Sequence, residues 1–388
     1  MSYTCNYNFP TPIRFGPGRI SELADACKEL GMAAPLLVTD PGLAKLPITD
    51  TAVAVCRDVG LDIAVFSDIK PNPVGKNVDD GVAAYKAAGC DGVIAFGGGS
   101  ALDVAKAVAL MAGHDRPLWD FEDAGDNWLR ADPDKIAPIV GVPTTSGTGS
   151  EVGRCSVIVD EDAKRKIVIF HPKMLPAKVI DDPELTVGLP AHITAAVGMD
   201  ALSHNLEAYC APGFHPMADG IALEGIRLCL SALERAVADG GDIEARSMMM
   251  AASTMGATAF QKGLGAMHSM SHPIGAALDA HHGLTNAVVM PYVLAFNRDV
   301  IKDRIAALSR YLGLPGGDFD AFLSEILRLR KAIGIPHTTA SLGMTEELCA
   351  SLAPKAAVDP TAPTNPKPLN PANLEALFRA SLAGTLEF

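Results

Sequence analysis

The sequence predicts two domains of different class: an N-terminal α/β domain with a parallel sheet over residues 1–188, and an all-α domain over residues 189–388. In the first half, short apolar, β-prone runs alternate with helical patterns, which is typical of a parallel sheet covered on both faces. After Pro190 the chain changes to long Ala-, Leu- and Met-rich segments with helical periodicity and almost no β-branched runs. A length of 388 residues also favours more than one core.

Four segments of the first half are predicted strands, because each is apolar and ends in turn-forming or small polar residues. They are APLLVTD (34–40), LDIAVFSD (61–68), DGVIAFGGGS (91–100) and KIAPIVGVPTTSG (135–147). Amphipathic helices are predicted at ITDTAVAVCRDVG (48–60), GKNVDDGVAAYKAAG (75–89) and SALDVAKAVALMAG (100–113). Residues 152–162 and 164–174 form a predicted β-hairpin, and residues 177–190 close the pattern.

The second half begins near residues 186–191 and reads as helices, for example at 218–240 and 245–263. The Pro-rich stretch 359–377 has the composition of a disordered tail, but it ends in a capped amphipathic helix at Asn373-Leu374-Glu375. We therefore expect an ordered loop followed by a terminal helix.

Composition limits the class of protein. With 48% hydrophobic and 20% charged residues, the chain has the balance of a globular protein, and no apolar run is long enough for a transmembrane helix. A net charge of −13 disfavours nucleic acid as a partner. The eight cysteines are scattered without a C-x-x-C pair, which fits neither a disulfide framework nor a thiolate zinc site. Without a signal peptide, we expect a cytoplasmic protein with a small-molecule substrate.

Four histidines and an aspartate include the spacing of a divalent-metal site made of three histidines and one aspartate. Asp200 and His204 lie four apart in a helical segment; His268 and His272 do so in another, and His282 follows after a short loop. Residues four apart share a helix face, so two helices could present ligands to one point. Either pair alone is more often ordinary core or surface polarity, but both pairs together favour a site for Fe(II), Zn(II) or a similar ion. Four protein ligands would leave room for a substrate oxygen.

Two small-residue loops follow predicted strands. The GGGS run at residues 97–100 lies between a strand and a helix, where backbone N–H groups and the helix dipole favour a pyrophosphate. Such turns often only satisfy steric needs, but a second loop, PTTSGTGS at 143–150, also follows a strand. Open α/β folds bind ligands at this carboxyl edge. No early G-x-G-x-x-G is present, so the domain is Rossmann-like rather than a standard Rossmann fold.

Asp40 ends the first predicted strand. An acidic residue there can accept hydrogen bonds from the adenine-ribose hydroxyls and repels a 2′-phosphate. It could also be a turn residue before Pro41. Its place in the strand–helix alternation favours cofactor selection, and NAD over NADP.

Four motifs in this order and spacing resemble the iron-containing (group III) alcohol dehydrogenases: GGGSALDVAKA, PTTSGTGSE, GMDALSHNLEAY and HSMSHPIG…HHG. The resemblance covers nearly the whole chain. It implies an N-terminal dinucleotide-binding domain, a C-terminal helical metal domain, and a homodimer or higher homo-oligomer.

By this resemblance Asp200, His204, His268 and His282 match the metal ligands, and His272 matches a histidine near the nicotinamide. His281 leaves the register ambiguous, but the fourteen-residue step from His268 favours His282. The residues that match cofactor contacts are Asn72, Gly98, Gly99, Ser100, Thr144, Thr145, Ser146, Gly147, Thr148 and Lys166.

One departure concerns the substrate. Before GLG the family commonly has Asn and a small residue, whereas this chain has Phe260-Gln261-Lys262. Lys262 could be a helix-surface charge, or it could bind a substrate carboxylate. Together with Arg154 it resembles the 4-hydroxybutyrate dehydrogenase branch, whose substrates carry an acid at the far end.

The predicted function is the NAD-dependent interconversion of a primary alcohol and an aldehyde, with the metal as Lewis acid and His268, His272 and His282 in the catalytic site. A 4-hydroxybutyrate (ω-hydroxy acid) dehydrogenase or semialdehyde reductase is the alternative. A dehydroquinate-synthase-like lyase is less favoured, because it needs a cluster of basic residues for a substrate phosphate and the helical half has none in evidence. A catalytically silent NAD-binding protein is disfavoured because the metal-ligand set is present.

Overall fold

The computed structural model of the protein describes residues 11–163 and 165–387. Its chain forms two compact units. The α/β unit holds the described residues up to Thr145 and then Gly149–Gly188. The helical unit holds Ser146–Thr148 and the described residues from Leu189 onward. The loop after the fourth predicted strand is therefore divided between the two units.

The α/β unit is built on six parallel strands in the order β1-β8-β5-β4-β2-β3, which confirms the predicted sheet. The strands are β1 (Ile13–Phe15), β2 (Pro35–Val38), β3 (Ala64–Phe66), β4 (Gly92–Gly97), β5 (Ile139–Pro143) and β8 (Lys178–Asp181). From β2 the chain runs outward to β3 and then crosses back to β4 on the other side of β2. The strand order reverses there, and ligands bind beside the carboxyl ends of strands at such points.

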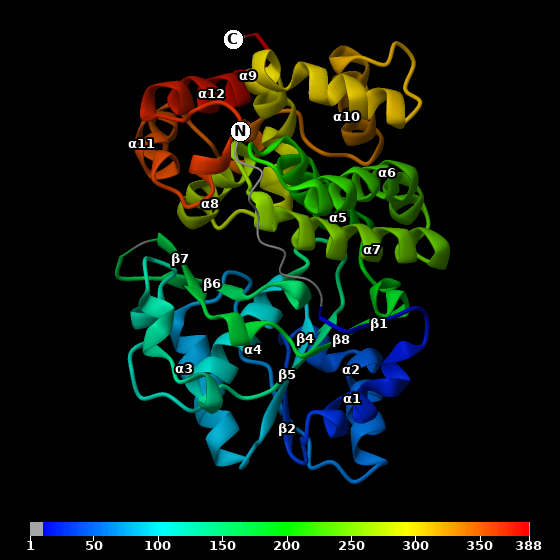
Figure 1. The fold of residues 1–388 in the computed structure, drawn as a ribbon, viewed down its shortest axis with the longest axis vertical. Coiled ribbons are helices and arrows are strands. Elements are labelled where there is room, and N and C mark those ends of the chain that lie inside the picture. Colours follow the sequence, from blue (N-terminus) through cyan, green and yellow to red (C-terminus); the bar gives the residue numbers. More distant parts are fainter. Residues whose placement is uncertain (1–10, 164, 388) are drawn as a thin grey trace. The chain divides into compact units, whose positions relative to one another are not determined.

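Side chains of the sheet alternate between two cores. Val93 and Ala95 of β4 pack in one core with α3 (Gly75–Ala87) and α4 (Gly99–Met111), whereas Ile94 and Phe96 pack in the other. The second core contains α1 (Leu23–Glu29) and α2 (Pro47–Arg57), so each face of the sheet has its own helix pair (Figure 1). A strand buried on both faces reads as a continuous apolar run, which is why these strands were recognisable. β1 and α1 were not predicted, because three and seven residues carry too little periodicity.

A buried lysine of α4, Lys106, connects this helix to the loop after β5 through hydrogen bonds. Lys106 is only 1% exposed, and its ammonium donates to Ser150 Oγ at 2.6 Å. Ser150 Oγ in turn donates to Asp103 Oδ1 at 2.6 Å, and Asp103 Oδ2 accepts from Val157 N at 2.9 Å. Val157 belongs to the predicted hairpin, which is confirmed as antiparallel strands β6 (Cys155–Asp160) and β7 (Arg165–Phe170). One network thus holds the helix, the loop and the hairpin together.

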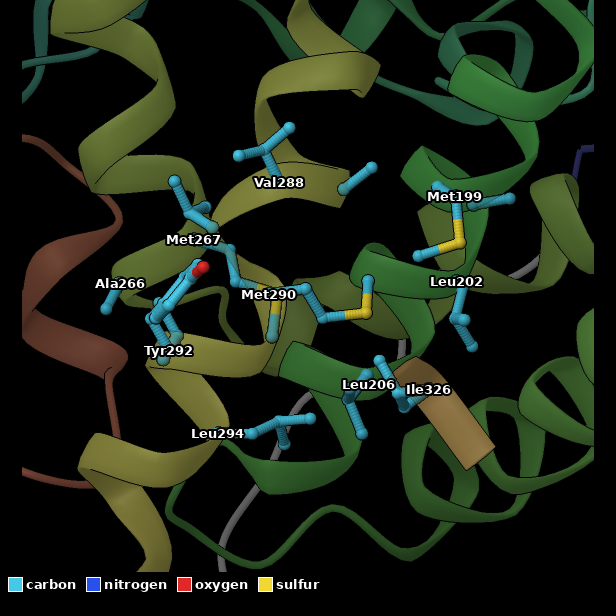
Figure 2. Close-up of a cluster of buried hydrophobic side chains, with 14 of the residues drawn as sticks. Met199, Leu202, Leu206, Ala266, Met267, Val288, Met290, Tyr292, Leu294 and Ile326 are labelled. Carbon is cyan, nitrogen blue, oxygen red and sulfur yellow. The ribbon is translucent and has the colours of Figure 1, made fainter. Parts of the chain in front are cut away.

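The helical unit contains eight α-helices among its described residues: α5 (Ala191–Cys210), α6 (Pro216–Ala238), α7 (Ile243–Ala259), α8 (Ala266–Leu278), α9 (His282–Tyr311), α10 (Phe319–Ala332), α11 (Glu346–Ala357) and α12 (Pro371–Ala383). Helix α5 is central and packs against α6, α7 and α9. It is buried on all sides from Thr194 to Tyr209, so it shows no polar stripe. Figure 2 shows Met199, Leu202 and Leu206 of α5 in one cluster with side chains of α8, α9 and α10.

The Pro-rich stretch is ordered, as predicted, and it supports α8. Asn365 exchanges side-chain hydrogen bonds with Asn297 of α9 at 3.1 and 2.9 Å, and its Oδ1 also accepts from Ala266 N, at the start of α8, at 3.1 Å. The terminal helix begins at Pro371, capped by reciprocal bonds between Asn370 and Asn373. Over the described ranges, every helix is too short or too polar to cross a bilayer.

Candidate functional site

Four side chains of the helical unit converge on one point. Asp200 and His204 come from consecutive turns of α5, His268 from the first turn of α8, and His282 from the first residue of α9. Each offers one ligand atom, and these atoms all lie within 4.8 Å of one another. Asp200 Oδ1 and His282 Nε2, for example, are 3.7 Å apart. One carboxylate and three imidazoles at such distances can hold a first-row divalent cation.

The neighbouring His281 lies outside this cluster. Its ring caps the start of α9 by accepting a hydrogen bond from Leu284 N at 3.3 Å. The turn before it contains Asp279 at φ 51°, the one described non-glycine residue in the left-handed region. This turn ends α8 and starts α9 so that His282, and not His281, lies beside Asp200.

Close approach of α9 to α5 depends on a glycine. A Cβ on Gly283 would lie 2.5 Å from Ala196 O and 3.0 Å from the Cβ of Asp200, both on α5. Gly256 of α7 has the same role on another side of α5, where a Cβ would lie 3.0 Å from the Cβ of His204. A side chain at either position would push a helix away from the ligand residues.

Each histidine of the cluster has a partner at Nδ1, which leaves Nε2 toward the common point. His204 Nδ1 lies 3.3 Å from Gly147 O, and His282 Nδ1 lies 3.4 Å from Ser271 Oγ. His268 Nδ1 donates to Glu207 Oε2 at 2.6 Å. Metal-bound histidines are commonly fixed in this way, because the bond at one nitrogen sets the ring orientation and the tautomer.

The surroundings of His204 and His268 shift the pKa of each imidazole in a way that suits metal binding. Burial lowers the pKa of His204 to about 4, so it stays neutral and keeps its lone pair. Burial also acts to lower the pKa of His268, but the Glu207 carboxylate outweighs it and the pKa lies above its ordinary value. Glu207 thereby makes His268 a stronger base and a stronger donor to a cation.

Sequence reasoning missed two supporting residues, and both had a signal. Glu207 lies three residues after His204 on the same face of α5, and its Oε1 also accepts from Met267 N at 2.7 Å. Asn286 lies one turn after His282 on α9. Its Nδ2 donates to Asp200 Oδ1 at 2.8 Å and is 3.2 Å from His268 Nε2. Helical spacing from known ligands would have identified both.

His272 lies beside the cluster and is fixed by a residue far along the chain. Its ring stacks on His282 with centroids 5.4 Å apart, and its Nδ1 donates to Asp359 Oδ2 at 2.8 Å. Asp359 also accepts from Thr361 N at 2.9 Å. Burial raises the pKa of Asp359, but His272 and Thr361 outweigh it, so the carboxyl titrates below its usual range. No spacing rule connects residues 272 and 359, and the sequence could not reveal this pair.

In the α/β unit, the cofactor candidates gather at the carboxyl edge of the sheet. Thr144 N donates to Gly97 O at 2.9 Å, and a Cβ on Gly98 would lie 3.3 Å from the Cγ2 of Thr145. Ser100, in the first turn of α4, bonds to Pro71 O, next to Asn72. Gly98 is the N-cap of α4 and has no side-chain cap, so the first N–H groups of α4 suit an anion. The two loops singled out in the sequence thus lie side by side as far as Thr145.

The remaining cofactor candidates lie elsewhere. Ser146, Gly147 and Thr148 belong to the helical unit, where Gly147 packs so closely that a Cβ would lie 2.8 Å from Val197 Cβ. Lys166 is in β7 of the hairpin. Asp40 follows β2, and its Oδ1 accepts from Gly42 N at 2.8 Å and from Leu43 N at 3.0 Å. One oxygen of Asp40 therefore stabilises a turn, and neither of these two hydrogen bonds uses Oδ2.

The two substrate candidates have different surroundings. Lys262 has a side chain only 2% exposed, and its ammonium lies 2.6 Å from Asp219 Oδ1, which also binds Arg304. Burial lowers the pKa of Lys262, and Asp219 partly offsets this. Arg154 lies 5.5 Å from the ring centroid of Phe170, and its charge acts on the nearby Asp123 carboxyl, whose pKa burial raises and Arg154 lowers in part. Lys262 is thus in direct contact with a carboxylate of its own chain, whereas Arg154 acts on Asp123 only through its charge.

A parallel α/β unit with a reversal point, joined in one chain to a helical unit with an Asp-His₃ cluster, defines the class of metal-dependent oxidoreductases that the motifs indicated. The chain belongs to the iron-containing alcohol dehydrogenase family. The profile of that family matches residues 10–183, and the profile of its C-terminal region matches residues 194–382.

Relatives agree with this assignment. The chain is 42% identical over 381 residues to a 4-hydroxybutyrate dehydrogenase of Cupriavidus necator, covering 96% of this chain and 98% of the relative. A crystal structure of a 1,3-propanediol oxidoreductase superposes with a TM-score of 0.92 at 35% identity, covering 97% and 99%. A sulfoacetaldehyde reductase from Bifidobacterium kashiwanohense, solved with NAD+, gives 0.89 at 31% identity, covering 98% and 99%.

These comparisons confirm the predicted family, the fold class and an enzyme that interconverts alcohols and carbonyl compounds with NAD and iron. The three relatives named above are dehydrogenases or reductases. They therefore give no support to the lyase alternative or to a silent NAD-binding protein.

Glu207→Gln should weaken metal binding tenfold to a hundredfold, which is about the cost of losing such a supporting contact. Whichever way the new amide turns, one of the two donors, His268 Nδ1 or Met267 N, loses its acceptor. The measurement is the metal dissociation constant by chelator competition, with the surface variant Glu224→Gln as control. A constant within twofold of wild type for Glu207→Gln would contradict the assignment.

Proposed function

We propose that Asp200, His204, His268 and His282 hold a divalent metal, Fe(II) or alternatively Zn(II), at which a primary alcohol and an aldehyde are interconverted with NAD(H). The observation that carries this proposal is the cluster of four ligand atoms within 4.8 Å. The donor set fits the metal: one carboxylate and three imidazoles, each with its Nδ1 engaged elsewhere.

When bound, the metal supplies Lewis acidity toward the alcohol or carbonyl oxygen, and NAD carries the hydride. The chain's own residues hold the metal in position and balance its charge. Asp200 brings negative charge, and His268 and His282 act as ligands in the catalytic site. We assign to His272 the transfer of the alcohol proton at Nε2, because Asp359 holds its Nδ1 and its ring stacks on His282.

For the cofactor, we propose a dinucleotide-binding domain over residues 1–188 and a metal domain over residues 189–388. The proposed NAD contacts are Asp40, Asn72, Gly98, Gly99, Ser100, Thr144, Thr145, Ser146, Gly147, Thr148 and Lys166. Support comes from the uncapped N-terminus of α4 and from the contacts between Gly97, Gly98, Thr144 and Thr145.

His268→Ala and His282→Ala should each lose most of the metal and nearly all turnover while NADH binding is largely retained. The reason is that these residues belong to the ligand cluster, and the glycine loop of the cofactor site belongs to the other unit. Metal content by elemental analysis and NADH binding by fluorescence are the measurements. His281→Asn is the matched control, because asparagine can still cap α9. Wild-type metal content in both alanine variants would refute the ligand assignment.

Asp40→Asn should shift cofactor preference toward NADP, because it removes the charge where a 2′-phosphate would lie while keeping an acceptor for Gly42 N and Leu43 N. Like-charge contacts cost several kcal/mol, so the NADP/NAD ratio of kcat/KM should rise by at least about tenfold. Asp40→Gly should shift the ratio similarly and also lower Tm, since the turn loses its acceptor. If neither variant changes the ratio, Asp40 is only a turn residue.

A second candidate function is an ω-hydroxy acid dehydrogenase, that is, a semialdehyde reductase acting on substrates such as 4-hydroxybutyrate. The relative from Cupriavidus necator favours it, and Arg154 offers a cation that is not held in a direct ion pair as Lys262 is. Of the two candidates for the substrate carboxylate, we favour Arg154 over Lys262. A substrate would have to compete with Asp219 for the Lys262 ammonium.

Arg154→Met should lower kcat/KM for succinic semialdehyde by roughly tenfold to a hundredfold, the range expected for one lost hydrogen bond to a charged group. Activity on butanal should be spared. Lys262→Met is the comparison variant: it should lower Tm, because it removes one member of a buried ion pair. If Lys262→Met and not Arg154→Met erases the preference, Lys262 is the carboxylate residue. A wild type that prefers butanal would exclude the acid-specific candidate.

We also propose that the protein is a cytoplasmic homodimer or higher homo-oligomer. The described cysteines are all free thiols, as suits a reducing compartment. Oligomeric state can be read directly from light scattering coupled to size exclusion.

A further inference from the structure

Thr39 directly follows β2 and carries a buried hydroxyl without a partner. The residue is 0% exposed, and its backbone N–H donates to Phe66 O at 3.0 Å, as the strand requires. Its Oγ1, in contrast, has no hydrogen-bond partner among the described residues. Buried hydroxyl groups are nearly always paired, since an unpaired one lowers stability, so this exception needs a physical reason.

The position of the Thr39 hydroxyl suggests a physical reason for the missing partner. A Cβ built on Gly97 would lie 3.8 Å from Thr39 Oγ1 and 2.7 Å from the Cβ of Ala101, in the first turn of α4. Gly97 ends β4, which pairs with β2, and its φ of 148° is one that other residues rarely adopt. The hydroxyl therefore lies between the end of β2 and the start of α4, where the strand order reverses.

Two independent features at this place favour an anion. The first N–H groups of α4, a helix of 13 residues, have no side-chain cap, and the helix dipole places positive charge there. The hydroxyl of Thr39 is an additional donor, already stripped of water by burial. The acidic side chains next to these features in the chain are engaged elsewhere: Asp40 directs its Oδ1 to the following turn, and Asp103 of α4 accepts from Ser150 and Val157.

We propose that Thr39 is a cofactor-binding residue whose hydroxyl donates a hydrogen bond to the pyrophosphate of the dinucleotide at the N-terminus of α4. The inference rests on the proposed use of NAD and extends it to a residue outside the glycine and threonine loops. On binding, the hydroxyl gains the acceptor that the protein alone does not give it. The same group then destabilises the cofactor-free protein and strengthens the complex.

Thr39→Val tests this, because valine has nearly the same shape and removes only the hydroxyl. Two changes are expected in the metal-loaded enzyme: the cofactor-free protein should become more stable, and its complex with NADH should become weaker. Without cofactor, Tm should rise by about 2 °C or more, since an unpaired polar group is gone. The Kd for NADH should rise roughly tenfold to a hundredfold, as for a lost hydrogen bond to a charged group. Thr39→Ser keeps the hydroxyl and should bind NADH within about threefold of wild type.

The binding of ADP and of adenosine to Thr39→Val shows which part of the cofactor the Thr39 hydroxyl contacts. Both carry the same base and ribose, but only ADP has the pyrophosphate, so Thr39→Val should weaken ADP as much as NADH and leave adenosine unchanged. An NADH and ADP Kd within twofold of wild type would overturn the proposal, and equal losses for ADP and adenosine would overturn the pyrophosphate contact. Neither result would affect the proposed function. Only a wild type that fails to bind NADH would overturn both.

Discussion

The helical unit is organised by one requirement: four ligand atoms from three helices must lie within 4.8 Å of one another. Helix axes usually lie 8–10 Å apart, and the aspartate side chain is short, so the backbones that carry the ligands must pack closely. Gly283 allows this for α9 and α5, and Gly256 allows it for α7 and α5. The position of α8 is set in turn by Glu207, which accepts from Met267 N, and by Asn365, which accepts from Ala266 N.

Charge balance is the second constraint on the site. Asp200 and Glu207 are both buried, and the imidazole of His204 is kept neutral by burial. Buried carboxylates are costly unless they are paired or bind a cation. Glu207 has His268 Nδ1 and a backbone N–H as partners, and Asp200 has the amide of Asn286. The remaining negative charge and the Nε2 atoms that face the common point favour a divalent cation, because a bound cation is often the largest local charge in such a site.

The α/β unit follows a related logic at the edge of its sheet. Small residues at Gly97 and Gly98 let β4 turn sharply into α4, and the pairing of β4 with β5 brings Thr144 and Thr145 next to them. The network around Lys106 then fixes the end of the same loop, at Ser150, to α4. Buried hydrogen bonds, and not the loop alone, therefore hold in place the backbone N–H groups that we propose to bind the cofactor.

Local sequence was sufficient for the fold class, because strand–helix alternation and long Ala-rich helices have clear periods. Helical spacing also related Asp200 to His204 and His268 to His272, whereas His282 was assigned through the family resemblance. Glu207 and Asn286 could have been found by helical spacing from His204 and His282. The sequence could not decide between roles that depend on partners distant in the chain. Asp219 forms an ion pair with Lys262, and Asp359 accepts a hydrogen bond from His272. The turn at Asp279 places His282, and not His281, in the ligand cluster. Those contacts join residues 43 and 87 positions apart, or depend on a single backbone angle, and only the folded chain brings them about.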